Sequence, residues 1–281
     1  MALQHVIGLD HVVVSVRDLD TAASAWRALG FTISPRGTHS PHMGSANYTI
    51  MFGEDYMELL GVLAPTEHNA AMREWLAEQE GIERAAFTAL DAAAGVAELQ
   101  AMGVAAIGPI AFGRPVELPD GRMAEARFNV MRWPVGLRPG GLRIFACQHL
   151  TRENVWVPSL LRHANGATRI LRLEMLTADP RAAAAEMGGL IAQSPRQEAD
   201  GAWALPTGPN RADLVFLDRA ILAARHPGVP LEGLPQEGAA ALVLGTSDLA
   251  AAARALGVAP GATVAVPAAR ATGVLLRFLP G

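Results

Sequence analysis

The chain contains no lysine, because all 23 of its cationic side chains are arginine. This absence excludes Schiff-base chemistry, the anchoring of pyridoxal phosphate and the lysine-bearing phosphate loop, since each of them needs an amine. Abundant Ala, Arg and Gly indicate that a GC-rich coding background, rather than a functional demand, explains the missing lysine. The single cysteine, Cys147, excludes a disulfide framework and cysteine-rich zinc sites.

Strong charge and long hydrophobic runs are also missing. The net charge is -4 and the pI is near 6.1, which gives no electrostatic footprint for nucleic acid. Charge or glycine interrupts every apolar stretch well short of the roughly 18 residues that a membrane span needs, and the opening MALQHVIGLDHVV lacks the organisation of a secretory signal. A hydrophobic content of 51% with 18% charged residues argues against disorder. We therefore expect a cytoplasmic protein with a packed core and no nucleic-acid or membrane partner.

One pattern of elements recurs four times along the chain. Each copy begins with a strand and a helix that an Asp residue caps, and shorter strands follow, which gives a βαβββ unit. The opening strand and helix of the copies occupy 8–31, 81–103, 168–190 and 239–256. The shorter strands are expected at 33–34, 46–52, 56–62, 105–112, 124–133, 142–148, 203–207, 212–218, 262–267 and 273–279. An ordinary α+β protein with accidental internal likeness is the alternative.

The four copies pair into two domains. Residues 152–166 read as a connection, because they lie between the second and third copies and contain Pro158 and Asn165-Gly166. The sequence therefore predicts an α+β fold with two curled-sheet domains, 1–151 and 167–281, joined by a linker over 152–166. In the second half, the strand positions equivalent to His11 and Glu58 hold neither an acid nor an imidazole. We therefore expect that domain to be a degenerate copy that packs against the first.

Three stretches carry a resemblance to a known family: LDHVVVSVRDLDTAASAWRALGF (9–31), HSPHMGSANYTIMFGEDYMELLGV (39–62) and RHANGATRI (162–170). In this order and spacing they resemble the vicinal oxygen chelate superfamily, which includes glyoxalase I, extradiol dioxygenases and fosfomycin-resistance proteins. Ala164 stands where the family has Pro. The first half is most similar to glyoxalase-like proteins of unassigned reaction. The resemblance implies paired βαβββ units whose curled sheet forms a cup that binds a divalent cation.

Strand alternation places polar groups on one face of each strand. His11, Val13 and Ser15 share a face opposite three valines, and Asn47 and Glu58 occupy similar positions on later strands. A sheet that curls into a cup would collect these polar groups inside it. The resemblance implies that His11 and Glu58 are metal ligands, and imidazole with carboxylate suits Zn, Mn, Ni or Fe(II). A hydrogen-bonded core histidine and an exposed glutamate are the alternative.

A third metal ligand is harder to find. Gln148 and His149 are the candidates, but they point to opposite faces, so only one enters the cup unless the strand bulges. Aligning the first two copies places Arg84 opposite His11 and Phe145 opposite Glu58. Arginine stays protonated and is no ordinary ligand. We take Gln148 as the third ligand, with His149 as the alternative.

Other polar residues are candidates for binding the substrate or moving a proton. Arg84 would hold a carboxylate, phosphate or enediolate oxygen, unless it is a surface arginine paired with a neighbouring acid. Asn47 would contact a substrate carbonyl or orient a ligand, unless it caps a strand end. His39 and His42 lie on a loop that could close over the cup, where His42 would transfer a proton. Tyr56 would line the cup or hydrogen-bond the substrate.

These residues predict a metal-assisted enzyme acting on a small oxygenated substrate, with Glu58 and His42 as its catalytic groups. We favour lyase or isomerase chemistry of the glyoxalase type, although a dioxygenase reaction fits the same arrangement. A metal-free protein that binds or sequesters a small molecule is the competing hypothesis. Monomer and homodimer both stay open.

Overall fold

The computed structural model describes residues 3–118, 120–259 and 263–281. Its helices are α1 Leu19–Ala28, α2 Ala70–Glu78, α3 Ala92–Ala101, α4 Pro180–Ile191, α5 Arg219–Arg225 and α6 Leu249–Leu256. The strands of the first half are β1 Val6–Val16, β2 Gly37–Thr38, β3 Ser45–Met51, β4 Tyr56–Val62, β5 Gly81–Ala89, β6 Ile107–Glu117, β7 Met123–Arg132 and β8 Arg143–His149. Those of the second half are β9 Ala167–Leu176, β10 Arg196–Gln197, β11 Trp203–Leu205, β12 Asp213–Leu217, β13 Gly238–Thr246, β14 Ala265–Val266 and β15 Leu275–Pro280.

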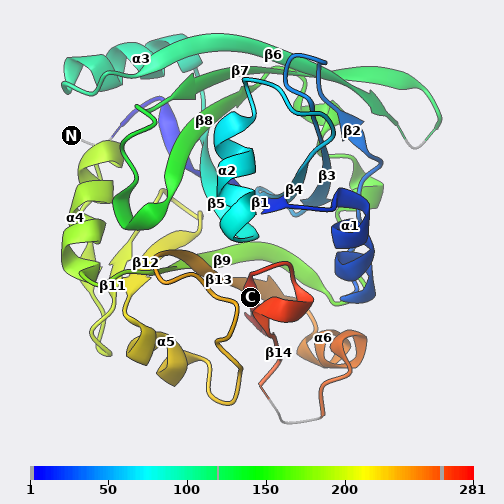
Figure 1. Ribbon diagram of the computed structural model, residues 1–281, viewed down its shortest axis with the longest axis vertical. Coiled ribbons are helices and arrows are strands. Elements are labelled where there is room, and N and C mark those ends of the chain that lie inside the picture. Colours follow the sequence, from blue (N-terminus) through cyan, green and yellow to red (C-terminus); the bar gives the residue numbers. More distant parts are fainter. Residues whose placement is uncertain (1–2, 119, 260–262) are drawn as a thin grey trace.

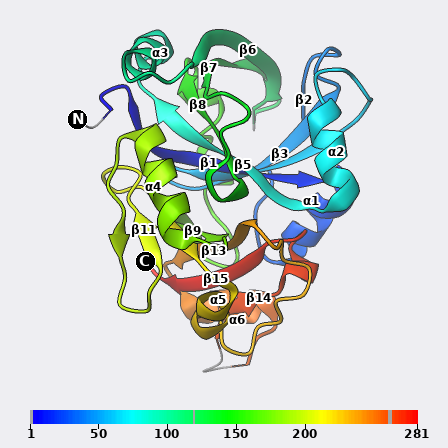
Figure 2. The same ribbon diagram turned by 60° about the vertical axis from the view of Figure 1, so that its left-hand side comes forward.

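The strands form two sheets of the same design. The first has the order β2-β3-β4-β1-β5-β8-β7-β6 and the second β10-β11-β12-β9-β13-β15-β14. In each sheet the two central strands are antiparallel, and each of them has a parallel partner on its outer side. Figure 2 shows the first sheet stacked above the second. The predicted α+β fold of four units in two curled sheets is confirmed.

Aspartates begin the repeated helices, as their position in the sequence predicts. Asp18, Asp91, Asp179 and Asp248 precede α1, α3, α4 and α6, and each side chain accepts a hydrogen bond from a backbone N–H in the first turn. Such a cap stabilises a helix by about 1 kcal/mol, because it satisfies an amide that has no partner within the helix.

The two sheets share one hydrophobic core. Val12, Val14 and Val16 of β1 are fully buried in it, together with Trp26 of α1 and Leu173 of β9. The predicted alternation of β1 is therefore confirmed, because its valine face packs inward between the sheets and the opposite face is left for other contacts. In the described part of the chain, no helix has both the length and the apolar character that crossing a membrane requires.

Two helices and one strand differ from the sequence prediction. Helices α2 and α5 were not predicted; each leads from the last strand of one copy into the next copy, and α2 carries Met72 and Leu76 on its buried face. A strand at 33–34 was predicted, but the edge strand is β2 at Gly37–Thr38. The physical reason is local, because Ser34 turns its hydroxyl back to accept from the Thr49 amide and donate to the Pro35 carbonyl. Of the strand predicted at 262–267, residue 262 lies outside the described residues.

Helix α5 explains why the two sheets differ in their concave faces. Leu222 of α5 and Leu234 after it pack in a buried cluster with Leu217 and Leu275 of the second sheet. Along their strands, Leu217 and Leu275 alternate with residues that pack into the shared core. They therefore lie on the opposite, concave face of the second sheet, which corresponds to the His11 face of β1. In the first sheet, α2 lies within the ring of strands seen in Figure 1 but packs to one side, against Val13 and Leu60. The second cup is therefore filled by the chain itself, whereas the first keeps a cavity.

Candidate functional site: the cup of the first sheet

A β-bulge shapes each central strand at the same place. The β1–β5 pairing shifts register at Asp10 and at Glu83, and the β9–β13 pairing shifts at the equivalent residues Leu171 and Ala240. A bulge sets two residues against one on the partner strand, so it breaks the simple alternation of faces. In the first sheet both bulged residues are acidic, and each bonds its own neighbour in the chain.

The first bulge brings Asp10 beside His11. Asp10 is buried, and its Oδ1 lies 2.7 Å from His11 Nδ1. His149 Nε2 approaches both carboxylate oxygens at 3.1 Å, and Thr88 donates its hydroxyl at 2.9 Å. Burial acts to raise the pKa of Asp10, but attraction to His149 and the hydrogen bonds from His11 and His149 outweigh it and hold that pKa below its ordinary value. Asp10 is therefore an ionised acceptor that fixes Nδ1 of His11 as a donor.

Glu58 completes this side of the cup. Asn47 Nδ2 donates to Glu58 Oε1 at 2.6 Å, and Glu58 Oε2 lies 3.7 Å from His11 Nε2. Tyr56 stacks on the His11 ring with 4.2 Å between centroids, and burial raises the Tyr56 pKa well above its usual value, so its phenol stays protonated. The carboxylate of Glu58 thus faces the imidazole that Asp10 orients.

Guanidinium groups occupy the other side. The strand registers align Glu58, Val13 and Arg84 in one row across β4, β1 and β5, so a carboxylate and a guanidinium stand on either side of Val13. Arg84 donates from Nε to Glu83 at 2.9 Å, and Arg143 also binds Glu83. Burial lowers the pKa of Arg84 and the charge of Glu58 opposes that shift, but an arginine stays protonated in proteins. Arg84 therefore pairs with its neighbour, as one of the two alternatives expected, and still faces the cup.

His11, Glu58 and Arg84 line one cavity of about 580 Å³. Seven of the residues predicted from the sequence lie on its wall: His11, His39, His42, Asn47, Tyr56, Glu58 and Arg84. The wall also contains three cationic residues and one imidazole that sequence reasoning missed: Arg114, Arg132, Arg143 and His68. Its apolar part includes Phe112, Phe128 and Phe145. Alternation along 107–117 could have indicated Arg114, because it shares a face with Phe112 on β6.

The loop histidines lie at the edge of this cavity. His39 is buried and its Nδ1 lies 2.8 Å from the Ser45 hydroxyl, and burial lowers its pKa, so the ring is neutral near pH 7. His42 is exposed, with its ring 5.1 Å from that of His68.

Cys147 lies on the wall of the same cavity. Burial raises the pKa of its thiol, which keeps it protonated and poorly nucleophilic.

The structure does not bring Gln148 to His11 and Glu58. Its amide oxygen accepts from the Ala92 N–H and from Asn129, and its amide nitrogen donates to the Leu90 carbonyl, so the side chain ties β8 to the start of α3. His149, the alternative ligand, contacts Asp10 instead of Glu58. As adjacent residues of a regular strand, Gln148 and His149 point to opposite faces, so His149 reaches Asp10 while Gln148 faces the start of α3.

The donor set of the cup does not fit a divalent cation. Among the described residues, no group of three His, Cys, Asp or Glu side chains is placed to hold a metal. His11 and Glu58 offer two donors, whereas Arg84 and Arg114 add positive charge to the same wall and both feel the charge of Glu58. Their positive charge on the same wall would repel a divalent cation.

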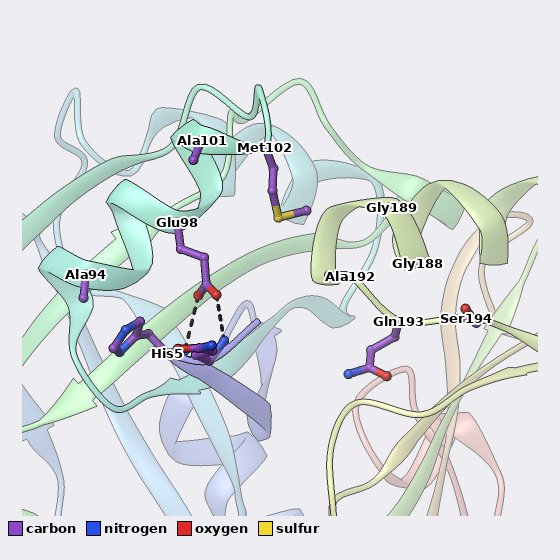
Figure 3. A pocket seen from close by; sticks show the side chains of 11 residues that line it. His5, Ala94, Glu98, Ala101, Met102, Gly188, Gly189, Ala192, Gln193 and Ser194 are labelled. Atoms are coloured by element: carbon purple, nitrogen blue, oxygen red, sulfur yellow. Dashed lines mark hydrogen bonds between the residues drawn. The ribbon is translucent and has the colours of Figure 1, made fainter. Parts of the chain in front are cut away.

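A second cavity, of about 790 Å³, lies between α3 and the end of α4 (Figure 3). Ala94 and Ala101 line it on one side and Gly188 and Gly189 on the other. The carboxylate of Glu98 is its main polar group, and backbone amides of Gln4 and His5 already occupy both of its oxygens. Convergent free polar groups mark a binding site, so we place the site in the cup.

Comparison with known proteins identifies the family. Residues 9–191, well over half of the chain, match the glyoxalase-like domain, so the chain belongs to the glyoxalase-like domain family. No curated protein matches the sequence. A hypothetical protein from Staphylococcus aureus is similar in structure, with a TM-score of 0.70 and 13% identity over 97% of this chain and 99% of that one.

Two enzymes of known name share the fold. A 4-hydroxymandelate synthase from Streptomyces coelicolor gives a TM-score of 0.53 at 15% identity, over 95% of this chain and 78% of that one. A fusion protein of a xylose isomerase-like TIM barrel with 4-hydroxyphenylpyruvate dioxygenase gives 0.55 at 13% identity, over 92% of this chain and 39% of that one. The resemblance to the vicinal oxygen chelate superfamily is confirmed at the level of fold.

Proposed function

We propose that the first cup is the active site of a lyase or isomerase in which Glu58 moves a proton on a small oxygenated substrate. The observation that supports this proposal is the position of the Glu58 carboxylate in the cavity wall. Asn47 Nδ2 donates to its Oε1 at 2.6 Å, and its Oε2 lies 3.7 Å from His11 Nε2. A positioned carboxylate accepts a proton from a carbon next to a carbonyl, and an imidazole beside it exchanges a proton with the substrate oxygen.

The neighbouring residues divide this task. Because Nδ1 of His11 donates to Asp10, Nε2 is the nitrogen that faces the substrate. Asn47 orients Glu58, and Arg84 stands across Val13 where negative charge on the substrate would be stabilised. No step is assigned to a cation, since the donor set does not fit one.

Exchange of carbon-bound hydrogen for deuterium tests this proposal without a known product. We would incubate the protein in D2O with a panel of small 2-oxo and 2-hydroxy compounds and follow the C–H signals by NMR. Glu58→Gln should lower the exchange rate by about 10²-fold or more. Glu67→Gln, at an exposed position near the rim, is the matched control. Equal rates for Glu58→Gln and the control, or exchange that a chelator abolishes and Zn, Mn, Ni or Fe(II) restores, would contradict the proposal.

A metal-free binding or sequestering protein is the second candidate. The apolar wall with Phe128 and Phe145, and the arginine at the second-copy position of His11, favour it. Such a protein would retain a compound from the panel in equilibrium dialysis while exchanging none of its hydrogens.

A further inference from the structure

Arg114 carries a feature that the proposed reaction does not use. It lies on β6 with 8% of its surface exposed, and it lines the cavity. Among the described residues, its guanidinium has no hydrogen-bond or salt-bridge partner, although it lies close enough to Glu58 and Tyr56 to feel their charge. A buried cation without a partner costs free energy, so this position suits an anion that comes from outside the chain.

The other arginines of the wall are less suited to this role. Arg84 and Arg143 already share the carboxylate of Glu83, and Arg132 is exposed at the rim. A guanidinium binds a carboxylate through two parallel N–H···O bonds when none of its donors is engaged elsewhere. Arg114 therefore is the residue of the cup best prepared to bind a carboxylate.

Asn47 adds a second requirement. The Glu58 carboxylate can only accept, so the amide nitrogen of Asn47 must face it, and the amide oxygen must point away. That oxygen is buried and has no donor within the described residues. Asn47 Oδ1 and Arg114 Nη1 both lie against Gly37, where they occupy the space that a Cβ atom would need. A free acceptor thus lies next to a free cationic donor.

We infer that the cup binds a small 2-hydroxycarboxylate with an apolar substituent, whose carboxylate pairs with Arg114 and whose hydroxyl donates to Asn47 Oδ1. The apolar part would contact Phe112 and Phe128, which line the same cavity. This inference rests on the proposed function for the location of the site, and it names the class of substrate on which Glu58 would act.

Three related compounds test the two contacts separately. By isothermal titration calorimetry at fixed ionic strength, 3-phenyllactate should bind at least about tenfold more tightly than 3-phenylpropionate, which lacks the hydroxyl, and than 3-phenylpropane-1,2-diol, which lacks the carboxylate. Arg114→Gln should weaken binding of both acids by about tenfold or more and leave the diol unchanged.

Arg122→Gln is the control, because Arg122 is an exposed arginine at the tip of the same hairpin. Arg114→Lys keeps the charge and should retain part of the affinity if Arg114→Gln fails to fold. Equal affinity of the diol and 3-phenyllactate for the unmodified protein, or unchanged acid binding in both Arg114 variants, would overturn the inference. Binding as expected without C–H exchange would overturn the proposed reaction and leave the inference standing.

Discussion

The charge of Asp10 organises the most buried part of the site. One carboxylate accepts from His11 and from His149, and all three side chains are almost fully buried. Such a group is stable only as long as its partners satisfy it, since an unpaired buried charge is strongly destabilising. Asp10 therefore acts as a positioning residue, which sets the orientation of His11 without contacting the cavity.

Asp10→Asn tests that role. We expect a loss of about 1–3 kcal/mol in the free energy of unfolding, because a buried imidazole loses its ionised acceptor. We also expect slower exchange of the substrate's carbon-bound hydrogen for deuterium, because Nδ1 of His11 is no longer fixed as the donor. The folded pKa of Asp10 lies below its unfolded value of 3.8, so its stabilisation is present above about pH 4 and is lost in stronger acid. Urea unfolding and ¹⁵N NMR of the imidazoles measure both effects. Unchanged His11 resonances would contradict this assignment, and Glu117→Gln, at an exposed position of β6, is the control.

At the scale of strands and helices, regular patterns were predictable and local irregularities were not. His11, Asn47 and Glu58 were found because each lies on a strand with a clear apolar face. Asp10 was missed because its role depends on a bulge, and a bulge arises from the pairing of β1 with β5, which alternation within one strand does not contain. Arg114 was missed because the approach of β6 to the rest of the cup depends on how far the sheet curls.

The two unpredicted helices decide which cup has a cavity. Both follow the last strand of a copy, yet α5 fills the second cup and α2 only flanks the first. Short helices such as α5, with seven residues, carry little periodicity of their own. The filling of the second cup is therefore a property of packing rather than of a motif.

Leu222→Ala tests whether α5 is a structural plug. Leu222 is fully buried, so its truncation should lower the free energy of unfolding by about 2–5 kcal/mol through the cavity it creates. Ligand binding in the first cup should be unchanged, because the two concave faces lie on separate sheets. Chemical unfolding and calorimetry measure the two effects, with Leu249→Ala at the exposed start of α6 as the control. A loss of binding equal to the loss of stability would show instead that α5 supports the first cup.

At the scale of the whole molecule, the connection between β11 and β12 of the second half contacts the first half behind the site. Thr207 accepts a hydrogen bond from the Leu9 amide at 3.0 Å, directly beside the bulge at Asp10. Arg211 donates to the carbonyls of Glu54 and Leu9. The division into 1–151, 152–166 and 167–281 stays a prediction. The two sheets share one hydrophobic core, and Trp156, within the predicted linker, packs on Tyr56 of the cup. These contacts hold the start of β1 and the turn before β4 against the second half of the chain.

Asp55 lies at this junction, where its carboxylate accepts from the Ile170 amide of β9 at 3.0 Å. Burial raises its pKa to about 7, and the hydrogen bond from Ile170 only partly offsets that shift. The folded pKa of Asp55 exceeds its unfolded value of 3.8, so the protonated carboxyl favours the folded state. Its contribution to the free energy of unfolding is fully present below about pH 4 and is lost as the pH rises through 7. Asp55→Asn keeps the acceptor and removes the charge, so the variant should gain stability relative to the unmodified protein between pH 4.5 and 8, at up to about 1.4 kcal/mol per pH unit. Urea unfolding across that range measures the difference, and Asp120→Asn should show none of this pH dependence. A difference that does not change with pH would mean that Asp55 is ionised in the folded protein, and that Arg169 and Arg211 offset its burial more fully than the geometry indicates.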